Sequence, residues 1–214
     1  MKVRLLKLSA ACLTLLTLST ISARSANVIT FDSLSEDGSG SFIANGYQGL
    51  VWSNFACLNA ILATNLVQTM GVNGYYYGMV SPSNVAFNAN GNPAEIDARG
   101  TNFSFLSTYL TGAWSSNLNI EVQGFRGGSL LYDETVVASA TNPTLFTFNY
   151  LNVDRLYFRS FGGQDAGFPP SHGQGGTWFV VDNMSIEFVP EPSTFLLAGL
   201  SALTLCAFLK RRRA

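Results

Sequence analysis

The chain has 214 residues, of which 47% are hydrophobic, 13% are aromatic and only 12% are charged. This apolar content excludes an intrinsically disordered chain, and the charged fraction is about half that of an average soluble domain. Eight of the twelve basic residues lie before position 25 or after position 209, so residues 26–190 carry a net charge of about −8 and no lysine. Such a surface repels phosphate backbones, so we expect no nucleic-acid partner.

Residues 1–25 have the parts of a secretory signal peptide. Basic residues before position 8 are followed by an apolar run at 8–21, and the small residues Ala23 and Ser25 suit a signal peptidase. We therefore predict an N-terminal signal helix, export through the secretion translocon and cleavage after Ser25, with cleavage after Ala23 or Ala26 as alternatives. An amphipathic helix that stays on the domain is disfavoured, because the apolar run has no polar face.

The positions of the cysteines exclude a disulfide within the exported region. Cys12 lies in the predicted signal peptide and Cys206 lies near the C-terminus, so Cys57 is the one cysteine between them. That region must be held by its own hydrophobic core or by a bound metal ion. Because Ala56 and Leu58 flank Cys57, we expect a small buried thiol there.

The C-terminal residues 189–213 combine a proline-rich segment, an apolar run and a basic cluster. A helix of the fifteen apolar residues 195–209 would rise about 22 Å, which is short of the roughly 30 Å hydrocarbon core of a bilayer. We predict a marginal transmembrane helix over 194–209 whose terminal cations stay in the cytoplasm. The motif residues are Pro190, Glu191 and Pro192 before this helix and Arg211, Arg212 and Arg213 after it.

This order of parts resembles the PEP-CTERM sorting signal of Gram-negative bacteria, also called the ice-binding protein C-terminal motif. The resemblance covers residues 189–213 and implies an exosortase as partner, cleavage near residues 190–192, and an intermediate anchored in the inner membrane. It further implies delivery to the cell surface or extracellular matrix, often beside exopolysaccharide gene clusters. The ice-binding label concerns the tail alone and implies no such activity. An ordinary stop-transfer anchor is the alternative, and it would not need the Pro-Glu-Pro segment.

The region between the two ends, residues 26–188, is expected to be one all-β domain. Alternating apolar residues predict nine short strands, which Asn-Gly, Asp-Gly and Gly-Gly turns separate. One short helical turn is expected within 58–70 and an irregular loop at 162–177. This pattern predicts a single antiparallel β-sandwich of the jelly-roll kind. The expected strands are 28–31, 50–55, 85–88, 103–109, 118–122, 130–137, 144–150, 153–159 and 178–188.

Asp182 shares its alternation phase with apolar residues of the last predicted strand, which places a carboxylate on the inward face. A buried charge needs compensation, either by a bulge that turns it outward, by backbone N–H donors, or by a cation. Calcium is the candidate cation for an exported acidic domain. Asp32 is the candidate second ligand, because first and last strands commonly pair in a jelly roll, and Glu36 or Asp37 are further candidates. The alternative is a hydrogen-bonded Asp182 without a metal.

Several segments resemble a family of secreted bacterial and fungal β-sandwich domains that frequently carry PEP-CTERM tails. This family is similar in plan to carbohydrate-binding jelly rolls, some of which bind structural calcium through an aspartate in a terminal Asp-Asn strand. Asp182 maps directly onto that position and Asp32 maps more weakly, whereas no sugar-contacting residue can be carried over. The segments that carry the resemblance are 29–34, 45–55, 83–88 and 181–188.

Aromatic residues point to binding rather than catalysis. Exposed rings stack on the apolar faces of sugars, and Tyr75, Tyr76 and Tyr77 follow an Asn-Gly turn signal, so these tyrosines are the candidate ligand-binding residues. We expect a non-enzymatic, exported cell-surface or matrix protein that binds extracellular polysaccharide.

Catalytic candidates are weaker. His172 is the only histidine, and no phosphate-binding loop or Gly-x-Ser-x-Gly motif occurs. The acidic pairs at 95/97 and 133/134 are expected to be solvated loop residues. An extracellular glycoside hydrolase with an unrecognised carboxylate site is the alternative function.

Overall fold

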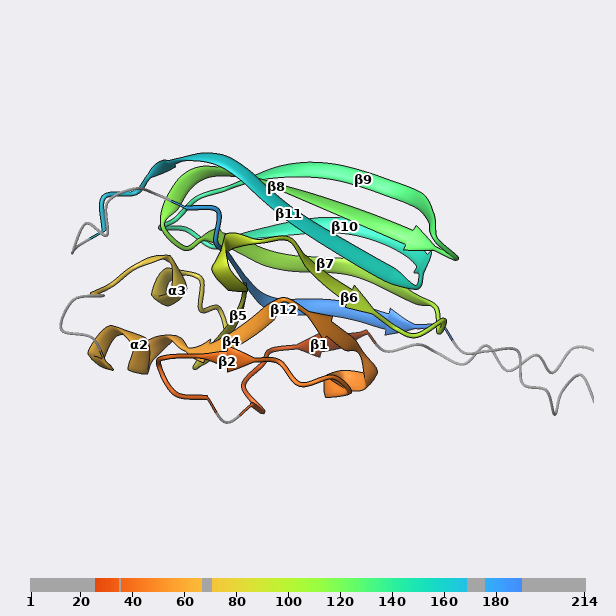
Figure 1. The fold of residues 1–214 in the computed structure, drawn as a ribbon, viewed down its shortest axis with the longest axis horizontal. Helices are drawn as coiled ribbons and strands as arrows, with labels where there is room; N and C mark the ends of the chain where they lie inside the picture. The colour runs from red at the N-terminus through yellow and green to blue at the C-terminus, as the bar shows by residue number, and fades with distance from the viewer. Residues whose placement is uncertain (1–25, 35, 67–70, 169–175, 190–214) are drawn as a thin grey trace, which may run out of the picture.

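The computed structural model describes residues 26–34, 36–66, 71–168 and 176–189. Within these ranges the chain forms two antiparallel sheets that pack face to face (Figure 1). The prediction of an all-β fold is confirmed. The first and last strands do pair, because Asn27 lies opposite Ile186.

The larger sheet has seven strands in the order β10-β7-β12-β5-β4-β2, with β1 also paired to β12. The smaller sheet has five strands in the order β3-β6-β11-β8-β9. The strands of the larger sheet are β1 (Asn27–Ile29), β2 (Ser41–Phe42), β4 (Phe55–Asn59), β5 (Asn84–Asn88), β7 (Phe103–Gly112), β10 (Thr144–Val153) and β12 (Phe179–Phe188). Those of the smaller sheet are β3 (Val51–Ser53), β6 (Ala94–Asp97), β8 (Ser115–Arg126), β9 (Ser129–Ala138) and β11 (Arg155–Asp165).

The helices are short. The predicted helical turn within 58–70 is confirmed by α2 (Ala60–Leu66), and a further turn forms α3 (Gly74–Tyr77). Single 3-10 turns occur at Tyr47–Gly49 and Ala89–Gly91. None of the helices in the described ranges is long and apolar enough to cross a membrane. The predicted signal helix and C-terminal helix both lie outside those ranges.

Two strands escape the sequence analysis, and one predicted strand divides. The strand expected at 50–55 is interrupted at Asn54, whose φ of 56° turns the chain so that β3 and β4 enter different sheets. The two-residue β2 and the four-residue β6 are too short to show a clear alternation. Glu95 and Asp97 therefore lie on β6, which corrects their expected place in a loop.

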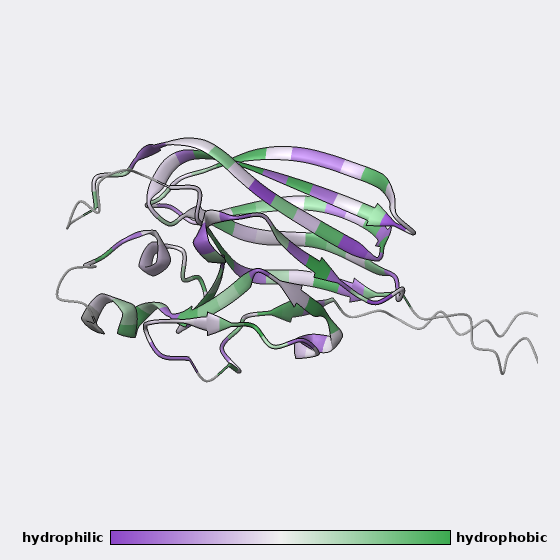
Figure 2. Ribbon diagram, in the orientation of Figure 1, coloured by the Kyte–Doolittle hydropathy of each residue, from purple (hydrophilic) through white to green (hydrophobic). Residues whose placement is uncertain are grey.

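The main core lies between the two sheets and is rich in aromatic side chains. Hydrophobic and hydrophilic residues alternate along the long strands (Figure 2), so each strand gives one face to this core. The ring of Phe55 lies edge-on to Trp52 and Phe158, with centroids 5.5 and 5.6 Å apart. Phe148 and Tyr150 of β10 are both buried in this core.

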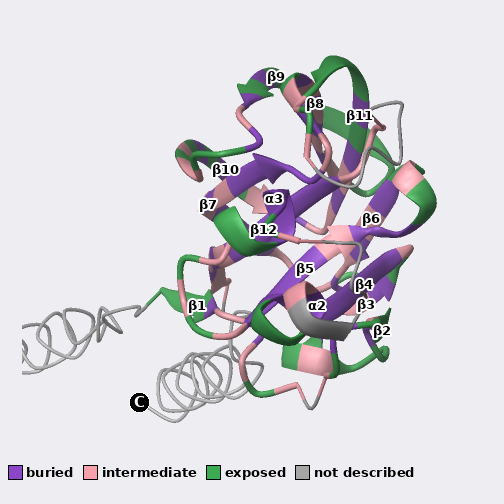
Figure 3. Ribbon diagram, turned by 90° about the vertical axis from the view of Figure 1, so that its left-hand side faces the viewer, coloured by how far each residue is buried: buried purple, intermediate pink, exposed green. Residues whose placement is uncertain are grey.

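A second, smaller core lies on the outer face of the larger sheet beneath α2 and α3, and Figure 3 views the molecule from that end. Tyr75, Val85 and Val180 belong to it. The helix α3 approaches the end of β7 so closely that a Cβ on Gly74 would lie 1.9 Å from the carbonyl oxygen of Gly112. Glycine is therefore required at the start of α3.

Strand β12 presents a different alternation phase to the main core in each half. In the first half Phe179 and Val181 point into the main core, while Val180 belongs to the second core. In the second half Met184 and Ile186 point into the main core. The prediction that all even positions of this strand face one core is therefore wrong for the first half.

A β-bulge at Asn183 causes the change of phase. Asn183 has a φ of 47°, and the register of β12 against β7 shifts between Asp182 and Ser185. An additional residue in a strand moves all following side chains to the opposite face. Asp182 thus lies on the outer face of the sheet and not between the sheets. Asn149 and Asn152 also have positive φ, at the places where β10 shifts register against β7.

We predict that Asn183→Val lowers the free energy of unfolding by about 1–3 kcal/mol, because a β-branched residue is strained at positive φ. Asn183→Gly is the matched control and should change it by less than about 1 kcal/mol, since glycine adopts this conformation freely. Urea denaturation measures both. Equal stability of the valine and glycine variants would contradict the bulge as described.

Candidate functional site

The most deeply buried charged group of the described residues is the carboxylate of Asp182, which has 0% exposure. Its Oδ2 atom accepts hydrogen bonds from the backbone N–H groups of Val80 and Ser81, at 2.7 and 2.8 Å. Its Oδ1 atom accepts from the N–H of Asn183 at 2.7 Å and from the Ser81 hydroxyl at 3.1 Å. Of the three forms of compensation expected for this residue, the structure shows the bulge and the backbone donors.

Asp32 and Asp182 bind the same stretch of chain, residues 80–84, at different points. The Oδ1 atom of Asp32 accepts a hydrogen bond from the N–H of Asn84 at 3.0 Å. The side-chain amide of Asn84 donates in turn to the carbonyl oxygen of Leu34 at 2.7 Å. The two carboxylates therefore fasten the 80–84 segment to the turn after β1 and to β12.

Calcium takes six to eight oxygen ligands and needs lone pairs that no other donor occupies. Four donors already occupy the carboxylate oxygens of Asp182. In the part of the chain that the structure describes, no three His, Cys, Asp or Glu side chains gather closely enough to hold a metal ion. The hydrogen bonds to Asp182 support the hydrogen-bonded alternative. Calcium binding by Asp182 and Asp32 stays a prediction, which a calcium titration would test.

Cys57 is the buried, free thiol that the sequence predicts. Burial raises the pKa of this thiol far above its usual value, and the charges of Glu36, Asp32 and Asp182 raise it further. Because the thiolate is the reactive form of cysteine, Cys57 is chemically inert in this setting. His172 lies outside the described residues.

The three consecutive tyrosines lie on the helical turn α3 and divide between core and surface. Tyr75 is buried, with its ring 5.2 Å from that of Phe87 and 5.9 Å from that of Trp114. This corrects the prediction of Tyr75 as a ligand-binding residue, because no face of its ring is open to solvent. The turn sets this arrangement, since residues along a helix point in successively different directions.

Tyr76 and Tyr77 remain on the surface, each with 38% exposure. The ring of Tyr77 stacks on that of Phe168, with centroids 6.0 Å apart and planes 27° apart. The ring of Tyr76 lies edge-on to that of Tyr77 at 6.0 Å. We call Tyr76, Tyr77 and Phe168 the aromatic cluster. Phe168 is absent from the sequence prediction, because it lies 91 positions from Tyr77 and only the fold brings the two together.

The outer face of the smaller sheet carries the other candidate groups. Arg155 lies over the ring of Phe125 at 4.2 Å and forms an ion pair with Glu95 at 3.1 Å. Arg159 lies over the ring of Phe161 at 5.5 Å. On this face an arginine therefore covers the ring of Phe125 and another covers the ring of Phe161.

The acidic residues on the smaller sheet are not arranged as a pair across a cleft. Glu95 is held in the ion pair with Arg155, and the carboxylate of Asp97 accepts the N–H of Arg99. Asp133 and Glu134 are neighbours on β9, so their side chains point to opposite faces of the sheet.

We predict that Asp182 gives the protein a distinctive loss of stability with rising pH. Burial raises the pKa of Asp182 from its ordinary value of 3.8 to about 6, although hydrogen bonds from Ser81, Val80 and Asn183 lower it. The folded state therefore holds the proton more tightly than the unfolded chain does. The stabilisation from protonated Asp182 is complete below pH 4 and is lost as the pH rises through 6, a total of about 3 kcal/mol.

Asp182→Asn removes the ionisation, so its urea denaturation between pH 4 and pH 7.5 should lack this decline. Asp37→Asn is the control. Asp37 is exposed and its pKa is lowered by hydrogen bonds from Ser39, so the substitution should leave the decline in place. Parallel pH profiles for the wild type and Asp182→Asn would contradict the prediction.

Comparison with known proteins identifies the end of the chain. The family model described as the PEP-CTERM protein-sorting motif matches residues 188–213, and no curated protein matches the chain in sequence. One similar solved structure is that of TmCBM61 in complex with β-1,4-galactotriose, which is 8% identical with a TM-score of 0.31 over 69% of this chain and 94% of that one. Pro190, Glu191, Pro192 and the three arginines 211–213 lie outside the described residues. The chain thus carries a PEP-CTERM protein-sorting motif directly after an all-β body.

Proposed function

We propose that this chain is an exported, non-enzymatic protein of the cell surface or extracellular matrix. A signal peptide at 1–25 directs it to the translocon, and an exosortase processes the tail at 189–213, whose transmembrane helix spans about 194–209. The body at 26–188 is a jelly-roll-like sandwich that binds polysaccharide. The observation that carries the proposal is the match of the sorting motif to residues 188–213.

The composition of the body is consistent with export from the cytoplasm. Residues 26–190 have a net charge of about −8 and contain no lysine. A net negative charge favours solubility, and it repels negatively charged polymers, so binding to such polymers could not rest on charge attraction.

The aromatic cluster supports polysaccharide as the ligand. Aromatic rings bind sugars by stacking against their C–H faces, which requires rings that are open to solvent. Tyr76 and Tyr77 meet this requirement. Phe125 on the smaller sheet meets it less well, because Arg155 already lies on its ring.

We predict that Tyr76→Ala and Tyr77→Ala each weaken polysaccharide binding about tenfold, which corresponds to about 1.4 kcal/mol for one lost stacking contact. Affinity electrophoresis against a panel of extracellular polysaccharides identifies the ligand, and calorimetry measures the change. Phe161→Ala is the control, because Phe161 is 43% exposed but lies under Arg159 on the smaller sheet. Equal losses for all three variants would reject the aromatic cluster as the binding site.

We predict that alanine at all three positions 190–192 blocks removal of the tail. An exosortase that recognises the Pro-Glu-Pro segment could no longer cut there, so the full-length tail should remain in the membrane fraction. Mass spectrometry of the protein from a host with an exosortase measures the mature end. Thr194→Ala is the control and should be processed normally. An unchanged mature mass for the triple variant would count against sorting by this motif.

A further inference from the structure

Both described ends of the body lie at one end of the molecule. Asn27 pairs with Ile186, and the N–H of Val189 donates to the carbonyl oxygen of Asn102 at 2.8 Å. The turns that surround these residues are joined to one another, since the N–H of Ala98 donates to the carbonyl oxygen of Asp154 at 2.9 Å. We call this end the entry-exit pole. It consists of residues 26–27, 97–102, 125–130, 152–155 and 186–189.

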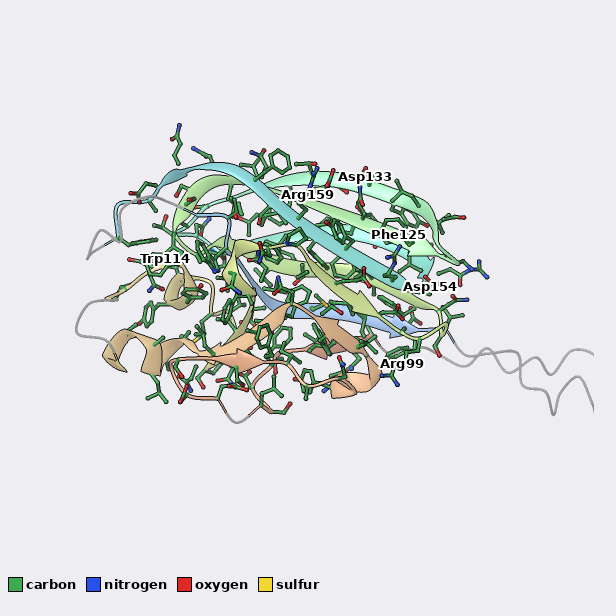
Figure 4. All side chains as sticks on the ribbon, in the orientation of Figure 1. Arg99, Trp114, Phe125, Asp133, Asp154 and Arg159 are labelled. Carbon is green, nitrogen blue, oxygen red and sulfur yellow. The ribbon has the colours of Figure 1, made fainter. Side chains whose placement is uncertain are left out.

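The aromatic cluster lies at the opposite end, which we call the far pole. The N–H of Gly74 in α3 donates to the carbonyl oxygen of Ala113 at 3.0 Å, and the N–H of Ala166 donates to that of Trp114 at 2.9 Å. In Figure 4, Arg99, Phe125 and Asp154 lie at the entry-exit pole and Trp114 lies at the far pole. Strand β12 runs between the poles, and its ten residues span about 33 Å.

The chain leaves the entry-exit pole without a spacer before the sorting signal. The matched motif begins at residue 188, and Phe188 is still part of β12, paired with Phe103. The rings of these two residues have centroids 6.2 Å apart. Five residues, 190–194, separate the body from the apolar run that begins at 195, and five residues reach at most about 17 Å. A bilayer that holds this run must therefore lie close to the entry-exit pole.

Charge is distributed unevenly between this pole and the rest of the body. The entry-exit pole carries three arginines, at 99, 126 and 155, and three acidic residues, at 97, 154 and 187, and Arg155 is paired with Glu95 just beyond its edge. The remainder of residues 26–189 carries one arginine, Arg159, and nine acidic residues. Anionic lipid headgroups repel acidic surfaces and attract exposed arginines such as Arg99 and Arg126. The entry-exit pole is thus the part of the body that an anionic membrane repels least.

We propose that the entry-exit pole faces the anionic membrane surface in the exported precursor, and that the body stands upright with the aromatic cluster at its outer tip. This orientation rests on the proposed function, because it requires that the C-terminal apolar run enters the bilayer. Upright presentation would place Tyr76 and Tyr77 where they can reach polysaccharide before the tail is cut.

The test places one probe at each end of the same strand in the full chain. Cys12 and Cys206 are first replaced by serine, and the buried Cys57 is left in place. Ser129→Cys then introduces a thiol at the entry-exit pole, and Thr141→Cys introduces one just beyond the far end of β9. Both native residues are exposed, small and hydroxyl-bearing, so the two variants are matched.

Each variant is labelled with a fluorescent maleimide and reconstituted into vesicles of zwitterionic and anionic phospholipid that carry nitroxide headgroups. We expect quenching at position 129 to exceed that at position 141 at least threefold. Equal quenching, or stronger quenching at 141, in protein that floats with the vesicles would overturn the upright orientation alone. Protein that does not float with the vesicles would overturn both the orientation and the membrane anchoring on which it rests.

Discussion

The rest of the larger sheet depends on the bulge at Asn183 and on the hydrogen bonds that Asp182 makes beside it. Without the bulge, one alternation phase would run through β12, and the strand could serve a single core. With it, the first half of β12 supports α2 and α3 through Val180, while the second half fills the space between the sheets through Met184 and Ile186. The bulge also turns Asp182 toward backbone donors at Val80 and Ser81. A buried carboxylate is tolerated because these donors were already obliged to find a partner.

The sequence predicts the long strands well because their pattern is produced by burial alone. Strands β7 to β12 each have ten or more residues, and stretches of them such as Leu118–Gly124 alternate long enough to reveal period two. It predicts poorly where a single residue changes the path of the backbone. Asn54 divides one apolar run between two sheets, and Asn183 inverts the phase of another. Asparagine tolerates positive φ, but an asparagine within a strand gives no indication of whether it points outward or forms a bulge.

The candidate site shows the same limit for contacts between distant parts of the chain. Chemistry alone required compensation for Asp182, and its partners at 80–81 lie about a hundred positions away, where no spacing rule reaches. Tyr75 was indistinguishable from Tyr76 and Tyr77 by composition, and only the direction of the helical turn assigns it to the core. Phe168 joins the aromatic cluster through tertiary packing. The residue types of the site could be predicted from the sequence, whereas their division between core and surface required the fold.

The position of the sorting motif links the stability of the body to its processing. Because the matched residues begin within β12, the proposed cut near residues 190–192 would fall close to a paired strand. Phe188 and Val189 hold the chain to β7 and to Asn102, so pairing of the last strand fixes the point at which the chain leaves the body. If the end of β12 did not pair with β7, the start of the matched motif would have no fixed position on the body. The proposed processing of the tail would therefore depend on pairing of the last strand, because that pairing fixes where the matched motif begins.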